Sequence, residues 1–169
     1  YTIDAAHMAA IASSSLESKT EWNIKGLEVA KSTPEESAKT WVGVFYNNIG
    51  WDLYEAEKYR EALANFKECW AFHEAMKNSE QPSIAKWSYA KTLRKLGKID
   101  ESFDIQIGLL EENDGVDPSG YGYEELGELY WLKGRKEKAH DFFGKAFAIL
   151  SKDVWLQKNE ADRLRRLER

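Results

Sequence analysis

Apolar residues recur every three or four positions along most of the chain, in segments separated by short polar loops. This period predicts amphipathic helices, and almost no segment has the strict alternation of a β-strand. The stretch "TPEE" at 33–36 combines a capping box with proline at the first helical position. Gly97 and Gly134 follow helix ends rich in lysine and leucine, where glycine commonly ends a helix. Helices are predicted at 3–13, 16–31, 34–56, 58–76, 83–96, 99–112, 118–133, 135–151 and 153–168.

Gly50 lies inside the strong helical pattern "YNNIGWDLYEAEKYREALANFKECW", where glycine costs about 1 kcal/mol relative to alanine. Aligning this stretch with two later ones places Gly50, Ala90 and Gly127 in register, at spacings of 40 and 37 residues. A second small residue follows each of them at a constant spacing, at Ala62, Ser102 and Ala139. We predict that the small residue of the first helix faces the small residue of the second. The two backbones can then cross closely, which offsets the low helix propensity of Gly50.

The repeated pattern resembles the tetratricopeptide repeat family, whose motif is W-x2-LG-x2-Y followed by A-x3-F-x2-A. The first unit matches at Gly50, Ala62 and Phe66. The third unit matches at Leu126, Gly127, Tyr130, Ala139, Phe143 and Ala146. The middle unit keeps Ala90, Leu93 and Gly97 but departs from the motif at Ser102, Gln106 and Leu109. The resemblance implies an all-α fold, a right-handed superhelical array of antiparallel helix pairs, or α-solenoid.

The domain organisation follows from the same alignment. Residues 34–153 would hold three repeats, at about 43–76, 83–116 and 120–153. Residues 1–33 would form a degenerate N-terminal helical pair. Residues 154–169 would form the C-terminal capping helix that repeat arrays need, with Leu164 and Leu167 turned inward and the arginines outward.

The resemblance implies a non-catalytic protein-interaction scaffold that holds an extended peptide or partner segment in a concave groove. The first helix of each pair would line this groove. The family's inward positions correspond here to Asn47, Asn48, Trp51, Tyr54, Trp87, Lys91, Arg94, Tyr121, Glu125, Glu128 and Trp131. An alternative is a signalling or regulatory sensor that responds to a peptide or metabolite. Members that clamp a terminal carboxylate use cationic and amide residues, and Asn48 fits that set whereas Val44, Ser88, Tyr121 and Glu125 do not.

The chemistry of these positions favours an acidic partner. Lys91, Arg94 and Lys95 form a basic cluster, and Trp51 and Trp87 are residue types that often dominate binding energy. Two alternatives stay open at this point. The basic cluster could pair with the acidic row Glu124, Glu125 and Glu128, and the tryptophans could pack into neighbouring helices or a homodimer contact.

No catalytic, metal or cofactor site is predicted. His7, His73 and His140 are far apart in sequence and lack metal-ligand spacing. Cys69 lies at a small-residue packing position and is expected to be buried and unreactive, while Glu124, Glu125 and Glu128 are expected to form an exposed row. Gln106 stands where the family usually has an aromatic residue. As a buried amide it would join a hydrogen-bond network or contact a ligand.

Composition limits the partners and the cellular location that are expected of the protein. The formal net charge of −5 over 169 residues argues against a nucleic-acid partner. No apolar run approaches the roughly 20 residues that span a bilayer, so no membrane insertion is expected. The single Cys69 fits a reducing compartment, and the start "YTIDAAHMAAIA" lacks the basic region of a secretory signal. The predicted location is therefore the cytoplasm.

Overall fold

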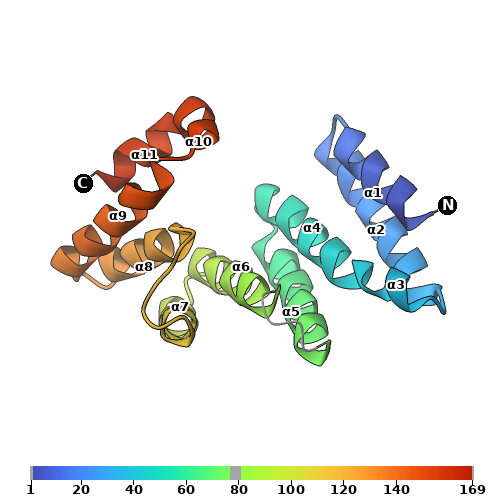
Figure 1. Ribbon diagram of the computed structural model, residues 1–169, viewed down its shortest axis with the longest axis horizontal. Coiled ribbons are helices and arrows are strands. Elements are labelled where there is room, and N and C mark those ends of the chain that lie inside the picture. The colour runs from blue at the N-terminus through green and yellow to red at the C-terminus, as the bar shows by residue number, and fades with distance from the viewer. Residues whose placement is uncertain (1, 77–80, 169) are drawn as a thin grey trace. The chain divides into compact units, whose positions relative to one another are not determined.

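The computed structural model describes residues 2–76 and 81–168. The chain forms two compact units, Tyr1–Leu96 (unit 1) and Gly97–Arg169 (unit 2). Throughout the described residues the regular secondary structure is helical (Figure 1). The all-α fold predicted from the sequence is confirmed.

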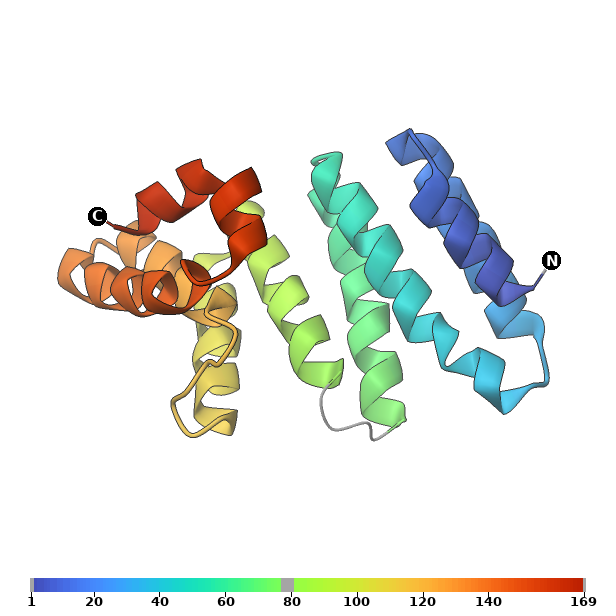
Figure 2. The same cartoon turned by 45° about the horizontal axis from the view of Figure 1, so that its top comes forward.

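Unit 1 is a row of helices, each of which packs against its neighbour in the chain. The contacts join α1 to α2, α2 to α4, α4 to α5, and α5 to α6, while the short α3 leads into α4. Figure 2 shows these helices side by side in the order of the sequence. The helices are α1 (Ile3–Ala12), α2 (Leu16–Ser32), α3 (Glu36–Lys39), α4 (Trp41–Glu55), α5 (Tyr59–Ala75) and α6 (Gln81–Lys95).

Unit 2 has the same kind of packing. Its helices are α7 (Ile99–Glu112), α8 (Tyr121–Leu132), α9 (Lys136–Leu150), α10 (Val154–Asn159) and α11 (Ala161–Leu167). Contacts join α7 to α8, α8 to α9, and α9 to α11. The predicted middle repeat, 83–116, therefore falls across both units, since α6 belongs to unit 1 and α7 to unit 2. The repeat boundaries stay a prediction.

Glycine lets the helices approach closely in two hairpins, α4–α5 and α8–α9. A Cβ atom added to Gly50 would lie 2.6 Å from Cε1 of Phe66, and one added to Gly127 would lie 2.4 Å from Cδ1 of Phe143. Both phenylalanine rings are buried. The predicted role of Gly50 in close packing is confirmed. The side chain nearest to it, however, is the ring of Phe66 rather than the methyl group of Ala62.

A left-handed residue follows each of α4, α6 and α8. Gly97 and Gly134 have φ angles of 77° and 73°, as expected for glycines that end helices, and Glu57 takes the equivalent position after α4 with φ 58°. Between α4 and α5 the amide of Lys58 donates to the carbonyl oxygen of Leu53 at 2.9 Å. This bond is typical of a Schellman cap, which redirects the chain into α5.

Two predicted helices begin later than the sequence indicated. The helix predicted from residue 34 starts at Glu36, because Glu35 is extended, and Thr33 Oγ1 accepts from the amide of Glu35. The predicted capping box involves the side chain of Glu36, which lies outside what the structure describes. This predicted helix is also divided at Thr40, whose hydroxyl donates to the carbonyl oxygen of Ser37 at 2.7 Å. The helix predicted from residue 118 starts only after Gly120, which adopts φ 78°.

The C-terminal segment is two short helices rather than the single predicted one. Glu160, with φ −130° and ψ 37°, separates α10 from α11. Leu164 and Leu167 are buried in the core of unit 2, as predicted. Arg165 and Arg166 are exposed. Arg163 is an exception to the predicted outward arginines, since it forms ion pairs within the unit.

Candidate functional site

Seven of the predicted binding residues lie on α4 and α6 of unit 1. We call this set the α4–α6 face: Asn47, Asn48, Trp51, Tyr54, Trp87, Lys91 and Arg94. All seven side chains are half-buried. Helical spacing places Asn47, Trp51 and Tyr54 on one side of α4, because residues three or four apart are neighbours on a helix surface.

Aromatic rings form a continuous row across this face. The ring centroids of Trp51 and Trp87 are 5.8 Å apart, and those of Trp51 and Tyr54 are 5.2 Å apart. Tyr54 continues the row to Tyr59, at 5.2 Å. Lys91 Nζ lies 4.9 Å from the centroid of Trp87, within the range of a cation–π contact. The tryptophans thus pack partly on each other and retain partly exposed rings.

Between α2 and α4, four polar side chains connect the two helices. Asn23 Nδ2 donates to Asp52 Oδ2 at 2.9 Å, and Lys19 Nζ lies 3.3 Å from Asp52 Oδ1. Asn48 Nδ2 donates to Asn23 Oδ1 at 3.4 Å. Of these four residues, only Asn48 was predicted from the sequence. The other three carry no sequence signal, because their positions in the repeat pattern do not distinguish them from surface polar residues.

The remaining predicted binding residues lie on α8 of unit 2. Trp131 is 37% exposed and meets His140 edge-on at a centroid distance of 5.9 Å. Tyr121 and Glu128 are half-buried. Glu125 is only 1% exposed, which differs from the exposure expected of a residue that lines an open surface. A single groove formed by both units stays a prediction.

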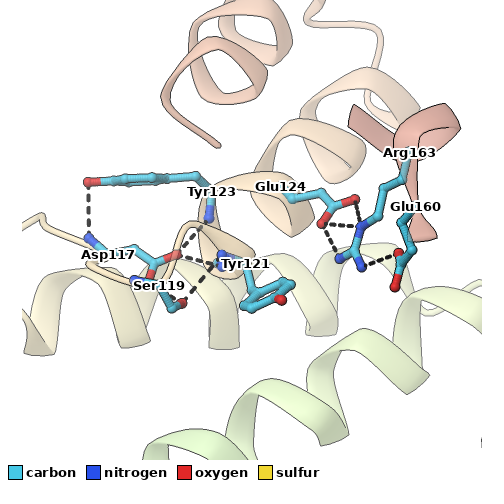
Figure 3. Close-up of polar contacts among 8 residues, drawn as sticks. Asp117, Ser119, Tyr121, Tyr123, Glu124, Glu160 and Arg163 are labelled. Carbon is cyan, nitrogen blue, oxygen red and sulfur yellow. Dashed lines mark hydrogen bonds and ion pairs between the residues drawn. The ribbon is translucent and has the colours of Figure 1, made fainter. Parts of the chain in front are cut away.

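The expected exposed row of glutamates is wrong for Glu124 as well as Glu125, since both are buried. Figure 3 shows the reason for Glu124: its carboxylate accepts hydrogen bonds from Arg163 of α11, including one from Nε at 2.9 Å. Arg163 also pairs with Glu160 at 2.9 Å. Burial opposes the charge of Arg163, but the bonds to both glutamates outweigh burial and raise the pKa of its guanidinium group.

Arg163 also affects Tyr121. Its guanidinium carbon lies 5.2 Å from the centroid of the Tyr121 ring. A predicted binding residue of unit 2 is therefore already in contact with the chain's own C-terminal segment.

The loop before α8 is organised by Asp117 (Figure 3). Its Oδ2 accepts from the amides of Gly122 at 2.6 Å and Tyr123 at 3.1 Å, and its Oδ1 accepts from the hydroxyl of Ser119 at 2.7 Å. In return the amide of Asp117 donates to the hydroxyl of Tyr123 at 3.0 Å. These bonds satisfy amides at the start of α8, which is the usual role of a helix-capping aspartate.

Cys69 is buried, as predicted, and its Sγ donates to the carbonyl oxygen of Gly43 at 3.4 Å. Burial raises the pKa of the thiol to about 11, so little thiolate exists at neutral pH. Gln106 is also buried, but its Nε2 has no hydrogen-bond partner among the described residues, so the predicted network is wrong at this atom. In the repeat alignment Gln106 corresponds to Phe66 and Phe143.

Histidine, cysteine and acidic side chains within the described ranges do not gather into a group that could hold a metal ion. In the same part of the chain no helix combines the length and apolar character needed to cross a membrane.

Residues 44–81 match the family model of the tetratricopeptide repeat. No curated protein matches the chain. Among solved structures, the chain is similar to the nearly identical TPR-like repeats of a putative kinesin light chain from Podosopora anserina. That similarity has 10% identity and a TM-score of 0.65, and covers 98% of this chain and 89% of the other.

The chain is also similar to two solved structures of MamA. For MamA MSR-1 the identity is 17% and the TM-score 0.60, with coverage of 90% of this chain and 79% of the other. For MamA AMB-1 the identity is 21% and the TM-score 0.59, with coverage of 94% of this chain and 79% of the other. At such identities the likeness establishes the fold, which is that of TPR-like helical repeats.

Proposed function

We propose that this chain, which contains a tetratricopeptide repeat and has the fold of such repeats, is a non-catalytic scaffold for protein–protein interaction. The binding surface is the α4–α6 face of unit 1, and its ligand is an extended peptide or partner segment with acidic side chains. The observation that carries this proposal is the half-buried aromatic row in which Trp51 and Trp87 meet.

The aromatic rings would supply most of the binding energy. Tryptophan and tyrosine offer large, rigid surfaces at low entropic cost, and they are enriched among the residues that dominate binding energy. The Trp51 ring packs against the ring of Phe66 at a centroid distance of 5.2 Å. The Trp87 ring packs against that of Trp51 at 5.8 Å. Their orientation is therefore set before any ligand arrives, which lowers the cost of ordering the site.

Charge supports the choice of an acidic ligand. Lys91 and Arg94 lie on α6 within the α4–α6 face, and Lys95 follows directly, with its Nζ 6.0 Å from the centroid of the Tyr59 ring. Basic groups beside the aromatic row favour carboxylates and speed the encounter with an acidic segment. In unit 2, Glu128 and Trp131 are secondary candidates, whereas Tyr121 is occupied by Arg163.

The test is selection of binders from a random displayed peptide library, followed by calorimetric titration of a selected acidic peptide. Trp87→Ala should weaken its binding by about 2 kcal/mol or more. The matched control is Trp155→Ala, because Trp155 is 60% exposed and lies on α10 of unit 2, which is not part of the α4–α6 face. If the peptide bound the wild type and a folded Trp87→Ala variant with equal affinity, the α4–α6 face would be excluded as the binding surface.

A second pair of variants tests the charge. Lys91→Glu should lower the association rate and reduce its dependence on salt, because a basic side chain beside the aromatic row is replaced by an acidic one. Lys152→Glu, which changes an exposed lysine after α9, is the control and should leave the rate nearly unchanged. Selected peptides that lack acidic residues would contradict the proposed ligand class.

A further inference from the structure

Trp155 differs from the other six tryptophans of the chain. It lies on α10, which joins α9 to α11 (Figure 1). Trp155 is 60% exposed, and Val154 beside it is 73% exposed. Each of the other tryptophans contacts a second ring or a lysine, whereas the indole of Trp155 contacts neither among the described residues. Val154 and Trp155 are therefore a contiguous apolar surface that unit 2 does not cover.

Basic side chains accompany this apolar pair. Lys158 follows Val154 by four residues and Trp155 by three, so it lies on the same side of α10. Lys152 lies two residues before Val154, and Arg166 belongs to α11, which packs against α10. All three basic side chains are exposed, and their charged groups have no partner among the described residues. Their charges are therefore available to a ligand.

Most acidic side chains of the same segment are already bonded. Three of the four acidic residues in 151–168 bind groups of the chain itself. These bonds are Asp153 to the amide of Trp155, Glu160 to Arg163, and Asp162 to Arg165. Residues 133–169, which follow α8, contain eleven Lys and Arg and six Asp and Glu, a net charge of +5 in a chain of net charge −5. Such a charge asymmetry is typical of a region that contacts a membrane or nucleic acid.

We propose that the exposed side of α10 binds the surface of an anionic lipid bilayer. Val154 and Trp155 enter the headgroup layer, and Lys152, Lys158 and Arg166 lie against the lipid phosphates. Tryptophan favours this layer because its ring is apolar and its indole N–H is polar. The contact is made at the bilayer surface and requires no spanning helix. It shares no residue with the α4–α6 face, so the inference goes beyond the proposed function.

The size and shape of the surface favour lipid over the other macromolecules. A stable protein interface buries about 800 Å² on each partner, which is more than two side chains supply. Single-stranded nucleic acid stacks its bases on several aromatic rings in succession, whereas α10 exposes one ring. A lipid surface needs neither a shaped partner area nor a row of rings. Insertion of apolar side chains and attraction to anionic headgroups instead add to each other.

Cosedimentation with vesicles tests the proposal. The chain should pellet with vesicles of mixed phosphatidylserine and phosphatidylcholine, less so in high salt, and should stay in solution with phosphatidylcholine alone. Lys158→Gln should lower the partition coefficient about fivefold, which is roughly what one basic charge near an anionic surface contributes. Lys67→Gln, at an exposed lysine of α5, is the matched control and should change it little.

A second matched pair tests the apolar contact. Val154→Ser should lower the partition coefficient several-fold, whereas Val116→Ser, at a 56% exposed valine in the loop before α8, should leave it nearly unchanged. The emission of Trp155, taken as the difference between the wild type and Trp155→Phe, should shift to shorter wavelength with the mixed vesicles. Failure to pellet with the mixed vesicles, equal losses within either matched pair, or an unshifted Trp155 emission would overturn the proposal. None of these measurements involves a peptide, so their failure would leave the proposed function standing.

Discussion

Gly127 and Gly144 form a matched pair of substitution sites in unit 2. Gly127 lies in α8 and Gly144 in α9, and both are inside their helices. A Cβ added to Gly127 would lie 2.4 and 2.5 Å from two ring atoms of Phe143, whereas one added to Gly144 would have no heavy atom within 4 Å. The two Gly→Ala variants therefore share the gain in helix propensity and differ in packing.

These contacts give the two variants different stabilities. Gly144→Ala should stabilise the protein by up to about 1 kcal/mol, which is the difference in helix propensity between the two residues. At Gly127 the same gain is opposed by overpacking against the buried ring of Phe143, which typically costs about 1–3 kcal/mol. We expect Gly127→Ala to be less stable than Gly144→Ala by that amount, because the propensity gain cancels in the comparison.

Urea unfolding followed by helical circular dichroism and by tryptophan fluorescence measures this difference. The slope of the free energy of unfolding against urea should be the same in both variants, so that the midpoints can be compared. If Gly127→Ala proved as stable as Gly144→Ala, the close approach of α8 and α9 at this glycine would be refuted.

Three further predictions concern the turns, a buried histidine and the C-terminal helix. Glu57→Gly should raise the free energy of unfolding by up to about 1 kcal/mol, because glycine adopts the left-handed conformation of residue 57 without the steric strain that a side chain causes there. A lower urea midpoint would contradict this. Burial lowers the pKa of His73 below its ordinary value of 6.5, so the unfolded state takes up the proton first and stability should fall as the pH drops below about 6.5. His73→Gln should reduce this pH dependence in urea titrations, and an unchanged dependence would show that other groups cause it. Arg163→Ala should destabilise the protein by about 1–3 kcal/mol because Glu124 stays buried without its partner, whereas Arg166→Ala, at an exposed site, should change the urea midpoint little.

The helices and their close contacts could be predicted because they depend on local patterns. Glycine at a fixed register position predicted tight packing, and the structure has that packing at Gly50 and Gly127. The partner of Gly50 was assigned incorrectly because small residues recur at Ala62, whereas the ring of Phe66 is what fills the space. Sequence spacing alone cannot distinguish the atom that faces a glycine from a neighbour one turn away.

The polar parts of the structure could not be predicted in the same way. Glu124 looked like a member of an exposed acidic row, but Arg163 lies far from it in sequence and makes its burial tolerable. Asp52 and Asn23 are likewise paired across two helices. Such pairs depend on tertiary contacts between particular atoms, and a helical period carries no information about them.

The most direct test of the proposed binding surface follows the indole N–H signals of the seven tryptophans by NMR during titration with a selected acidic peptide. Single Trp→Phe variants assign the signals. The proposal predicts that the signals of Trp51 and Trp87 shift and saturate with the affinity measured by calorimetry, while the signal of Trp155 stays in place. Saturable binding that shifts Trp155 and leaves both Trp51 and Trp87 unchanged would contradict it.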